Sequence, residues 1–315
     1  MSSRRDALKR RLKTIRFRMN CRDHTEAPRP MLQIAGLIIV LLLVGGGLVL
    51  TAGPAAMEAL PFELALIGGA AFGTVLIGNS PEVAREAFAG FVRAFRGPKW
   101  QRADYAGLFA LLGTLMRQAK RGGFVAIESD IERPEESEAF RAAPRILADA
   151  AARTLICDAF RLMALDLADP ARADQRMEEA ISAQLDRRLK AVGALNTLAD
   201  ALPALGIVAA VLGIIRTMGA IDQDPAILGA MIGAALLGTF LGVFLAYGLV
   251  GPIAARYAQI VEEEAGFLDT IRSILRSFGE GAAPALALEL ARTGLPPGLQ
   301  PDSVPTQPVK LHRVA

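Results

Sequence analysis

Four long segments without a charged residue constrain this chain more than any other feature. The segments that contain no Asp, Glu, Lys or Arg are 30–57, 64–81, 201–215 and 225–255. A helix needs about 20 predominantly apolar residues to cross the hydrocarbon core of a bilayer. We therefore predict an all-α integral membrane protein with four transmembrane helices, at residues 31–52, 62–79, 197–217 and 226–250. The first segment is too long for the apolar region of a cleaved signal peptide, so we expect it to be retained as an anchor.

Basic residues set the expected orientation, because the cytoplasmic loops of membrane proteins are enriched in Lys and Arg. Residues 1–30 contain ten Lys and Arg against three acidic residues, and residues 51–61 contain no basic residue. We expect both termini to be cytoplasmic, with a large helical cytoplasmic domain at 80–196 between the second and third helices. Residues 251–295 should continue the fourth helix into the cytoplasm. The basic tail, 1–30, is expected to be dispensable for the activity of the protein. The Pro-rich end, 296–315, is expected to be disordered.

The remaining composition argues against several classes of protein. The formal charge of +3 comes from the basic tail, which has a surplus of seven positive charges, so the rest of the chain sums to −4. No nucleic-acid partner is therefore expected. The two histidines lie in the tails, and the two cysteines have no metal-ligand spacing. No nucleophile–base pair or phosphate loop is present, so we predict no enzyme, no cofactor and no metal site.

The middle of each predicted span contains no ionisable side chain. Glu63, Asp200 and Arg216 are all expected at the ends of spans. Proteins that move ions through a membrane normally keep an ionisable group at mid-depth, where its cost is tolerated only for function. Either this chain conducts no ions, or a partner helix supplies the carboxylate. The residues alone leave both possibilities open.

A few polar, small and proline residues stand out in the third and fourth spans. Thr239 lies midway along the fourth span, where its hydroxyl either bonds to the carbonyl of Ala235 or has another role. Pro203 and Pro252 are expected at the same membrane level. They either occupy an early turn and a helix end or form a flexible joint. Small residues at one-turn spacing predict close packing, either of the two helices with each other or against a neighbouring subunit. They are Gly206, Ala210, Gly213, Gly229, Gly233, Gly238 and Gly242.

Two segments of these spans carry a resemblance to a known family. They are LPALGIVAAVLGII (202–215) and LLGTFLGVFLAYGLVGP (236–252), and further matches follow in order at IGGAAFGTVLIGNS (67–80), GFVAIESDIERPEESEAF (123–140) and APRILADA (143–150). Together they resemble the MotA family of flagellar motor stator proteins, in the MotA/TolQ/ExbB proton channel superfamily. The resemblance covers about residues 31–290. The first 30 residues depart from it, because family members commonly begin at a methionine like Met31.

The resemblance implies a function and a set of partners. Family members sit in the inner membrane as multi-pass proteins and associate into a ring, a pentamer. They surround helices of MotB, a peptidoglycan-anchored subunit that supplies the proton-binding aspartate. Ion flux, most often of protons, then drives torque on the rotor protein FliG. The alternative is an energising subunit like ExbB or TolQ, although those proteins have three membrane helices and a long periplasmic start.

Within the membrane, the resemblance assigns roles to four residues. Thr239 matches the polar residue beside the ion path. Ala210 occupies the position at which sodium-driven relatives usually carry threonine, which favours the proton as coupling ion here. Pro203 and Pro252 match the two prolines that couple ion passage to movement.

In the domain at 80–196, the resemblance implies a contact with FliG. Glu128 matches the acidic contact position, and Lys120 falls where the family usually has arginine. Arg121 is adjacent, so either basic residue can serve. Without the resemblance, Glu128 would be interpreted as part of a solvated acidic face, together with Asp130, Glu132 and Glu136.

Overall fold

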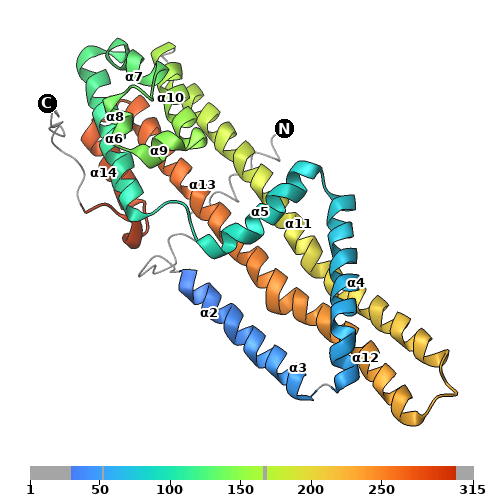
Figure 1. Cartoon of the computed structure of the whole chain (residues 1–315). Coiled ribbons are helices and arrows are strands. Elements are labelled where there is room, and N and C mark those ends of the chain that lie inside the picture. The colour runs from blue at the N-terminus through green and yellow to red at the C-terminus, as the bar shows by residue number, and fades with distance from the viewer. Residues whose placement is uncertain (1–29, 52, 166–168, 303–315) are drawn as a thin grey trace. The chain divides into compact units, whose positions relative to one another are not determined.

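The structure is a computed structural model that describes residues 30–51, 53–165 and 169–302. Every regular element in these residues is helical (Figure 1). The chain divides into two compact units. The first, here called the membrane unit, comprises Pro28–Gly97 and Asp186–Val261. The second, here called the globular unit, contains Pro98–Leu185 and Glu262–Ala315. Residues 1–29 of the predicted basic tail and residues 303–315 of the predicted C-terminal tail lie outside the described residues.

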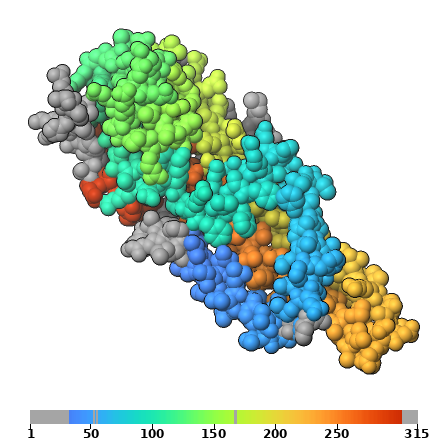
Figure 2. All heavy atoms as spheres, viewed as in Figure 1, coloured from blue at the N-terminus to red at the C-terminus, as the bar shows by residue number. Residues whose placement is uncertain are grey.

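Four helices in the described part of the chain are long and apolar enough to span a membrane. They lie at Leu32–Thr51, Ala56–Gly78, Pro170–Met218 and Pro225–Gly279. The first is built from α2 (Pro30–Val40), a π-helix η1 (Leu41–Gly45) and α3 (Gly46–Thr51). Figure 2 shows the atoms of this helix and of the second span together on one face of the membrane unit. The prediction of an all-helical chain with four candidate membrane spans is confirmed.

The second span, α4 (Pro54–Gly78), begins earlier than predicted. Pro54 occupies the first turn of the helix, where its missing N–H costs no hydrogen bond. Pro61 was interpreted as part of a loop, but it lies inside α4. The connection from α3 is therefore shorter than predicted. As a consequence, Glu63 lies within the candidate span and not at its end, which corrects the interpretation from sequence.

The next helix, α5 (Pro81–Arg96), buries a face made of small residues. These are Ala84, Ala87, Gly90 and Ala94. A Cβ atom on Gly90 would lie 2.5 Å from Cε1 of Tyr257 in α13 (Gly251–Gly279), so glycine permits this ring to lie against the helix. The Tyr257 hydroxyl donates to Oε1 of Glu86 at 3.0 Å, and Nη1 of Arg93 lies 2.6 Å from the same oxygen.

The third span belongs to α11 (Pro170–Met218), which is much longer than the span itself. We expected a helix starting near Thr197, with Pro203 in its first turns. The structure corrects this, because α11 begins at Pro170 and Pro203 lies in its interior. No glycine–proline break separates the amphipathic residues before Thr197 from the apolar residues after it. A single helix therefore contributes to both units.

The fourth span begins with a capped α12 (Pro225–Phe244). Asp224 accepts a hydrogen bond from the Ala226 backbone N–H at 2.8 Å. A π-helix, η3 (Leu245–Val250), then joins α12 to α13 without interruption. The helix continues beyond the span to Gly279, whereas the prediction extended the continuation to residue 295. The alternative in which Pro252 ends the helix is wrong. The wider π turn accommodates the proline, whose ring would otherwise collide with a carbonyl of the preceding turn.

The globular unit is organised around α6 (Arg102–Gly122) and the later part of α13. Short helices η2 (Phe124–Ile127), α7 (Glu128–Glu132), α8 (Glu138–Arg141) and α9 (Pro144–Ala148) follow α6, and α10 (Ala150–Leu165) and α14 (Pro284–Thr293) complete the unit. Aromatic side chains fill its centre. The rings of Trp100 and Phe267 stack with centroids 3.9 Å apart, and Tyr105 meets Phe267 edge-on at 5.1 Å.

A shielded ion-pair network joins α11 and α13 within the globular unit. Arg272 donates through Nε and Nη2 to both carboxylate oxygens of Asp174, at 2.7 and 2.8 Å. The same Nη2 lies 3.0 Å from Glu178. The Arg272 side chain is only 14% exposed, so the network is largely removed from solvent.

The segment after α14 corrects the expectation of a disordered end for residues 296–302. A 3-10 helix, η4, forms at Pro297–Leu299. Arg102 in α6 donates to the backbone carbonyl of Gln300 at 2.8 Å and pairs with Asp302. The amide of Gln300 also donates to the carbonyl of Leu295, which holds this segment in place.

Candidate functional site

The site expected in the membrane unit lies where α11 and α12 cross. Glycines let the two backbones touch there. A Cβ on Gly206 would lie 2.7 Å from the carbonyl oxygen of Gly238, and one on Gly242 would lie 2.6 Å from the carbonyl oxygen of Leu202. Both distances are shorter than real Cβ atoms adopt, so only glycine fits. The predicted close packing of the third and fourth helices is confirmed at these positions.

Ala210 lies at the crossing, and Thr239 is next in sequence to a glycine of the crossing; both residues are expected beside the ion path. Ala210 is 6% exposed on α11, and its backbone nitrogen would lie 3.3 Å from a Cβ on Gly238. Gly238 immediately precedes Thr239, which is half-buried on α12. The Thr217 hydroxyl bonds to a carbonyl of its own helix at 2.9 Å. Among the described residues, the Thr239 hydroxyl makes no such bond, so the expected alternative of a bond to Ala235 is not observed.

The two prolines expected to couple movement lie on α11 and α13. The crossing pairs Gly206 with Gly242 in an antiparallel register. Continued from there, the register places Pro203 opposite Leu245. Pro252 lies about two turns further along, roughly 10 Å at 1.5 Å per residue. In this register the two prolines are offset along the pair of helices, and their shared membrane level stays a prediction.

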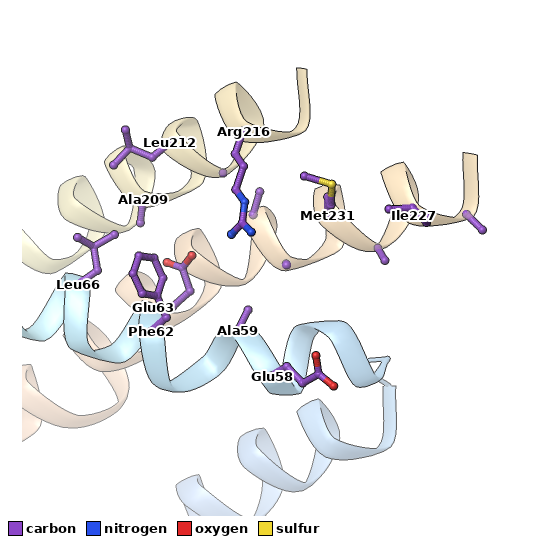
Figure 3. Close-up of a pocket in the computed structure, with 15 residues that line it drawn as sticks. Glu58, Ala59, Phe62, Glu63, Leu66, Ala209, Leu212, Arg216, Ile227 and Met231 are labelled. Carbon is purple, nitrogen blue, oxygen red and sulfur yellow. The ribbon is translucent and has the colours of Figure 1, made fainter. Parts of the chain in front are cut away.

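A cavity of about 850 Å³ opens beside this crossing, bounded by α4, α11 and α12. Figure 3 shows the side chain of Glu63 entering it from α4, with the guanidinium of Arg216 reaching into it from α11. Glu58 also lines the cavity but points away from both groups (Figure 3). The other lining residues are apolar or glycine: Ala59, Phe62, Leu66, Ala209, Leu212, Gly213, Ala226, Ile227, Ala230, Met231, Ala234 and Ala235.

Sequence reasoning missed Glu63 because it placed the start of α4 too late. A signal for the correct start was present, since Gly53-Pro54 is a typical beginning of a helix. Had the helix been started there, Glu63 would have fallen in its third turn. Its burial could not have been predicted, because it depends on the packing of α4 against α12 and not on local sequence.

The three residues expected to contact a rotor protein lie close in sequence in the globular unit. Lys120 and Arg121 occupy the last turn of α6, and Glu128 is the first residue of α7. Gly123, with φ of 73°, turns the chain between the two helices in a conformation that favours glycine. All three side chains are exposed. Within the described residues, none of the three takes part in an ion pair.

Two acidic residues near Glu128, unlike Glu128 itself, form ion pairs with arginines of this chain. Glu132 accepts a hydrogen bond from Arg161 at 2.6 Å, which lowers the pKa of the Glu132 carboxyl. Glu136 lies 3.1 Å from Arg133. The acidic face is therefore partly neutralised internally, and Glu128 is left available for an external charge. On the basic side, burial and then the charge of Arg121 lower the pKa of Arg117.

In the described part of the chain, no group of three or more His, Cys, Asp and Glu residues could hold a metal ion. The chemistry available at the crossing is instead that of a hydroxyl and a carboxyl in an apolar setting. Such groups can pass protons or orient a small ion.

Comparison with known proteins identifies relatives over most of the chain. Residues 34–123 match the family described as Motility protein A N-terminal, and residues 145–270 match the MotA/TolQ/ExbB proton channel family. Motility protein A of Escherichia coli (strain K12) is 36% identical over 265 residues, which make up 84% of this chain and 90% of that protein. Chemotaxis protein LafT of Vibrio parahaemolyticus is 33% identical over 271 residues, 86% of this chain and 95% of that protein.

Two solved structures share the fold. The structure of C. jejuni MotAB matches with a TM-score of 0.67 and 19% identity, over 83% of this chain and 94% of the matched chain. The flagellar MotAB stator complex from Bacillus subtilis matches with a TM-score of 0.65 and 22% identity, over 82% and 92%. At these identities the likeness establishes the arrangement of helices.

Proposed function

Because this chain belongs to the Motility protein A family, we propose that it is a stator subunit of the flagellar motor. It forms an ion channel with a MotB-like partner, and ion flux through that channel drives rotation. Its relatives are named for motility and chemotaxis, and its fold matches chains of MotAB complexes. The chain acts as a membrane channel component and torque generator, not as an enzyme.

The observation that carries the proposal is the composition of the α11–α12 crossing. Thr239 follows Gly238, which lies against Ala210, and the Thr239 hydroxyl is free of any bond to its own helix. A free hydroxyl in an apolar helix is available to a passing ion or to a group on a neighbouring helix. Neither α11 nor α12 itself contributes a carboxylate at the crossing. A partner helix that brings an aspartate next to Thr239 would complete the path.

The topology follows from the basic residues, which favour a cytoplasmic location for both termini and for residues 80–196. The membrane is the inner membrane, because the cytoplasmic domain must reach the rotor. The exposed Lys120, Arg121 and Glu128 then contact charged residues of FliG. The chain associates with copies of itself in a ring, a pentamer, around the partner helices.

The coupling ion in this proposal is the proton. Sodium and similar hard cations require several oxygen ligands. Ala210 contributes only a methyl group at the crossing, where a threonine would add a hydroxyl oxygen. Pro203 and Pro252 interrupt the hydrogen-bond ladders of α11 and of the helix η3–α13, so movement of the crossing can be passed along both helices.

The test is proton flux into vesicles that contain the chain alone or the chain with its MotB-like partner. We expect flux only from the complex, and loss of that flux when Thr239→Val removes the hydroxyl while keeping the side-chain shape. Robust flux through the chain alone would overturn the proposal. Swimming speed measured at a constant proton gradient should not depend on external sodium, and a dependence would refute the proton as coupling ion.

A further inference from the structure

We propose that Glu63 is a second proton-binding carboxyl of the ion path, supplied by this chain and reached through the cavity between α4, α11 and α12. The inference rests on the proposed channel function for its role in transport. The binding of a proton by Glu63 can be measured separately. The ligand is a proton delivered by water, not a metal cation.

The first observation is that Glu63 is buried without a partner for one of its oxygens. The residue is 6% exposed. Among the described residues, none forms a hydrogen bond with Oε2. Buried polar atoms in proteins are normally hydrogen-bonded, and an ionisable group inside a membrane span is tolerated where it serves a function. The unpartnered oxygen is therefore satisfied by a proton or by water.

The second observation is where the carboxyl lies. A Cβ on Gly238 would be 2.9 Å from Oε2 of Glu63, 3.1 Å from Cβ of Ala209 and 3.3 Å from the backbone nitrogen of Ala210. The carboxyl thus reaches the point at which α11 and α12 cross. Gly238 leaves room for this oxygen, because a Cβ there would lie closer to Oε2 than real Cβ atoms normally approach, and the carboxyl would have to shift. Thr239, the next residue, is the hydroxyl that the proposed ion path uses.

The third observation is the cavity into which Glu63 points (Figure 3). Its volume of about 850 Å³ has room for several waters, each of which takes about 30 Å³ in the liquid. The charged groups that face it are Glu58, Glu63 and Arg216. Arg216 makes no ion pair with Glu63 among the described residues, yet it faces the same space. It can stabilise the carboxylate after proton release while leaving an oxygen free to accept the next proton.

The lining favours a proton over a metal cation. The described residues that line the cavity include no Ser, Thr, Asn or Gln. Helix carbonyls are engaged in their own ladders, so one buried carboxyl is the main source of oxygen ligands. A hard cation would lack the oxygens it requires. A proton needs one lone pair. Hydronium in the cavity gives its proton to Oε2, forming one O–H bond, and a water on the far side later accepts it.

The first experiment measures protonation in the purified full-length chain, without partner. Infrared difference spectra recorded across a pH titration should contain a band of a protonated carboxyl that disappears in Glu63→Gln and persists in Glu58→Gln. Glu58 is the matched control, because it lies on the same helix and lines the same cavity but is exposed. Absence of a Glu63-dependent band overturns the proposal, whether or not the complex conducts.

The second experiment measures proton flux in vesicles that contain the complex with the MotB-like partner. Glu63→Gln should lower flux several-fold, and Glu63→Asp should restore part of it. Glu82→Gln, which changes an exposed carboxyl of α5 outside the cavity, should leave flux at the wild-type level. Matching melting temperatures for the three complexes would exclude a folding defect. Wild-type flux in Glu63→Gln would overturn the relay role. If the wild-type complex conducts nothing, the proposed channel function fails, while the infrared titration still decides whether Glu63 binds a proton.

Discussion

Gly206 on α11 and Gly242 on α12 lie in direct backbone contact, such that a Cβ atom on Gly242 would lie 2.9 Å from the Cα of Gly206. The contact belongs to a small buried cluster of the membrane unit that includes Leu202, Ala209, Leu237 and Leu241. The two helices therefore approach as closely as two backbones allow. Small residues produce this kind of approach in membrane proteins because apolar side chains gain little by leaving lipid.

Replacing Gly242 with alanine should destabilise the membrane unit. The new methyl would lie 2.6 Å from the carbonyl oxygen of Leu202, which is backbone and cannot move alone. Overpacking of this kind costs about 1–3 kcal/mol. Gly233→Ala is the control, since a Cβ there meets nothing within 4 Å. Thermal unfolding in detergent should show a lower Tm for Gly242→Ala only. Equal values would contradict the packing described.

Removing Arg272 should destabilise the globular unit much more than removing a neighbouring arginine. Arg272→Ala leaves Asp174 and Glu178 as shielded carboxylates without their cation. Breaking such a pair by removing one partner costs about 3–5 kcal/mol. Arg276→Ala is the matched control, one turn further along α13, and its pair with Glu280 is more than half exposed on both sides. Exposed pairs contribute about 0–1 kcal/mol. In thermal melts, Arg276→Ala should therefore lower the melting temperature much less than Arg272→Ala does.

The thiol of Cys157 gives a pH-dependent stability that can be measured. Burial raises the pKa of Cys157 to about 11. A thiol in an unfolded chain has a pKa of about 8.5. The folded state therefore holds this proton more tightly. The stabilisation is complete below the unfolded pKa, and it is lost as the pH rises from there through the folded pKa.

Wild-type protein should accordingly lose more of its thermal stability between pH 8 and 10.5 than Cys157→Ala. Relative to Cys157→Ala, the free energy of unfolding of the wild type should fall by at most about 1.4 kcal/mol per unit of pH. In a Cys21→Ala background, where Cys157 is the single cysteine, alkylation of the native protein at pH 8 should be slow and should accelerate on unfolding. Rapid alkylation of the folded protein would refute the burial.

Sequence alone predicted the helical class and the four spans, because an uncharged apolar run long enough to cross a bilayer is typical of a membrane helix. It did not predict where helices begin when no strong break is present. The second span was predicted to begin at residue 62, after Pro61, but Pro61 lies inside α4. The polar residues before Thr197 were separated from the span that they continue. Both errors misplace a helix start, since Gly53-Pro54 begins α4 and no break separates the residues before Thr197 from the rest of α11.

The candidate site was predicted in part. Ala210 and Thr239 came from the resemblance. Ala210 lies at the α11–α12 crossing next to Gly238, the residue before Thr239, and the roles of both residues stay predictions. Glu63 could not be found this way, since its importance arises from the meeting of α4 and α12, which are far apart in sequence. The exposure of Glu128 was expected from its acidic surroundings. That its neighbours Glu132 and Glu136 are internally paired required the fold.

Reversing the charges at the end of α6 and the start of α7 tests the proposed rotor contact. Glu128→Lys combined with Lys120→Glu and Arg121→Glu should abolish swimming, because like charges then oppose each other at the interface. A single Glu128→Gln should only weaken swimming, since exposed pairs are individually weak. Proton flux in vesicles should survive in both, because these residues lie in the globular unit and not in the spans.

The control for charge reversal is a swap of Arg276 and Glu280, an exposed pair elsewhere in the same unit. That swap keeps the net charge and should leave swimming intact. A compensating charge reversal on FliG should restore swimming to the triple variant. Normal swimming of the triple variant would show that these side chains do not contact the rotor protein.

The continuity of α11 and of α12–η3–α13 has a mechanical consequence. Each helix runs through both units without a loop, and an α-helix resists bending and torsion along its length. Only Pro203 and Pro252 remove a donor from these ladders, and at Pro252 the π turn has already loosened the winding. We therefore expect the two helices to bend most easily at Pro203 and Pro252, which are offset by about two turns. Under the proposed function, we expect a displacement at the crossing to bend the two helices at these two residues, at two separate heights.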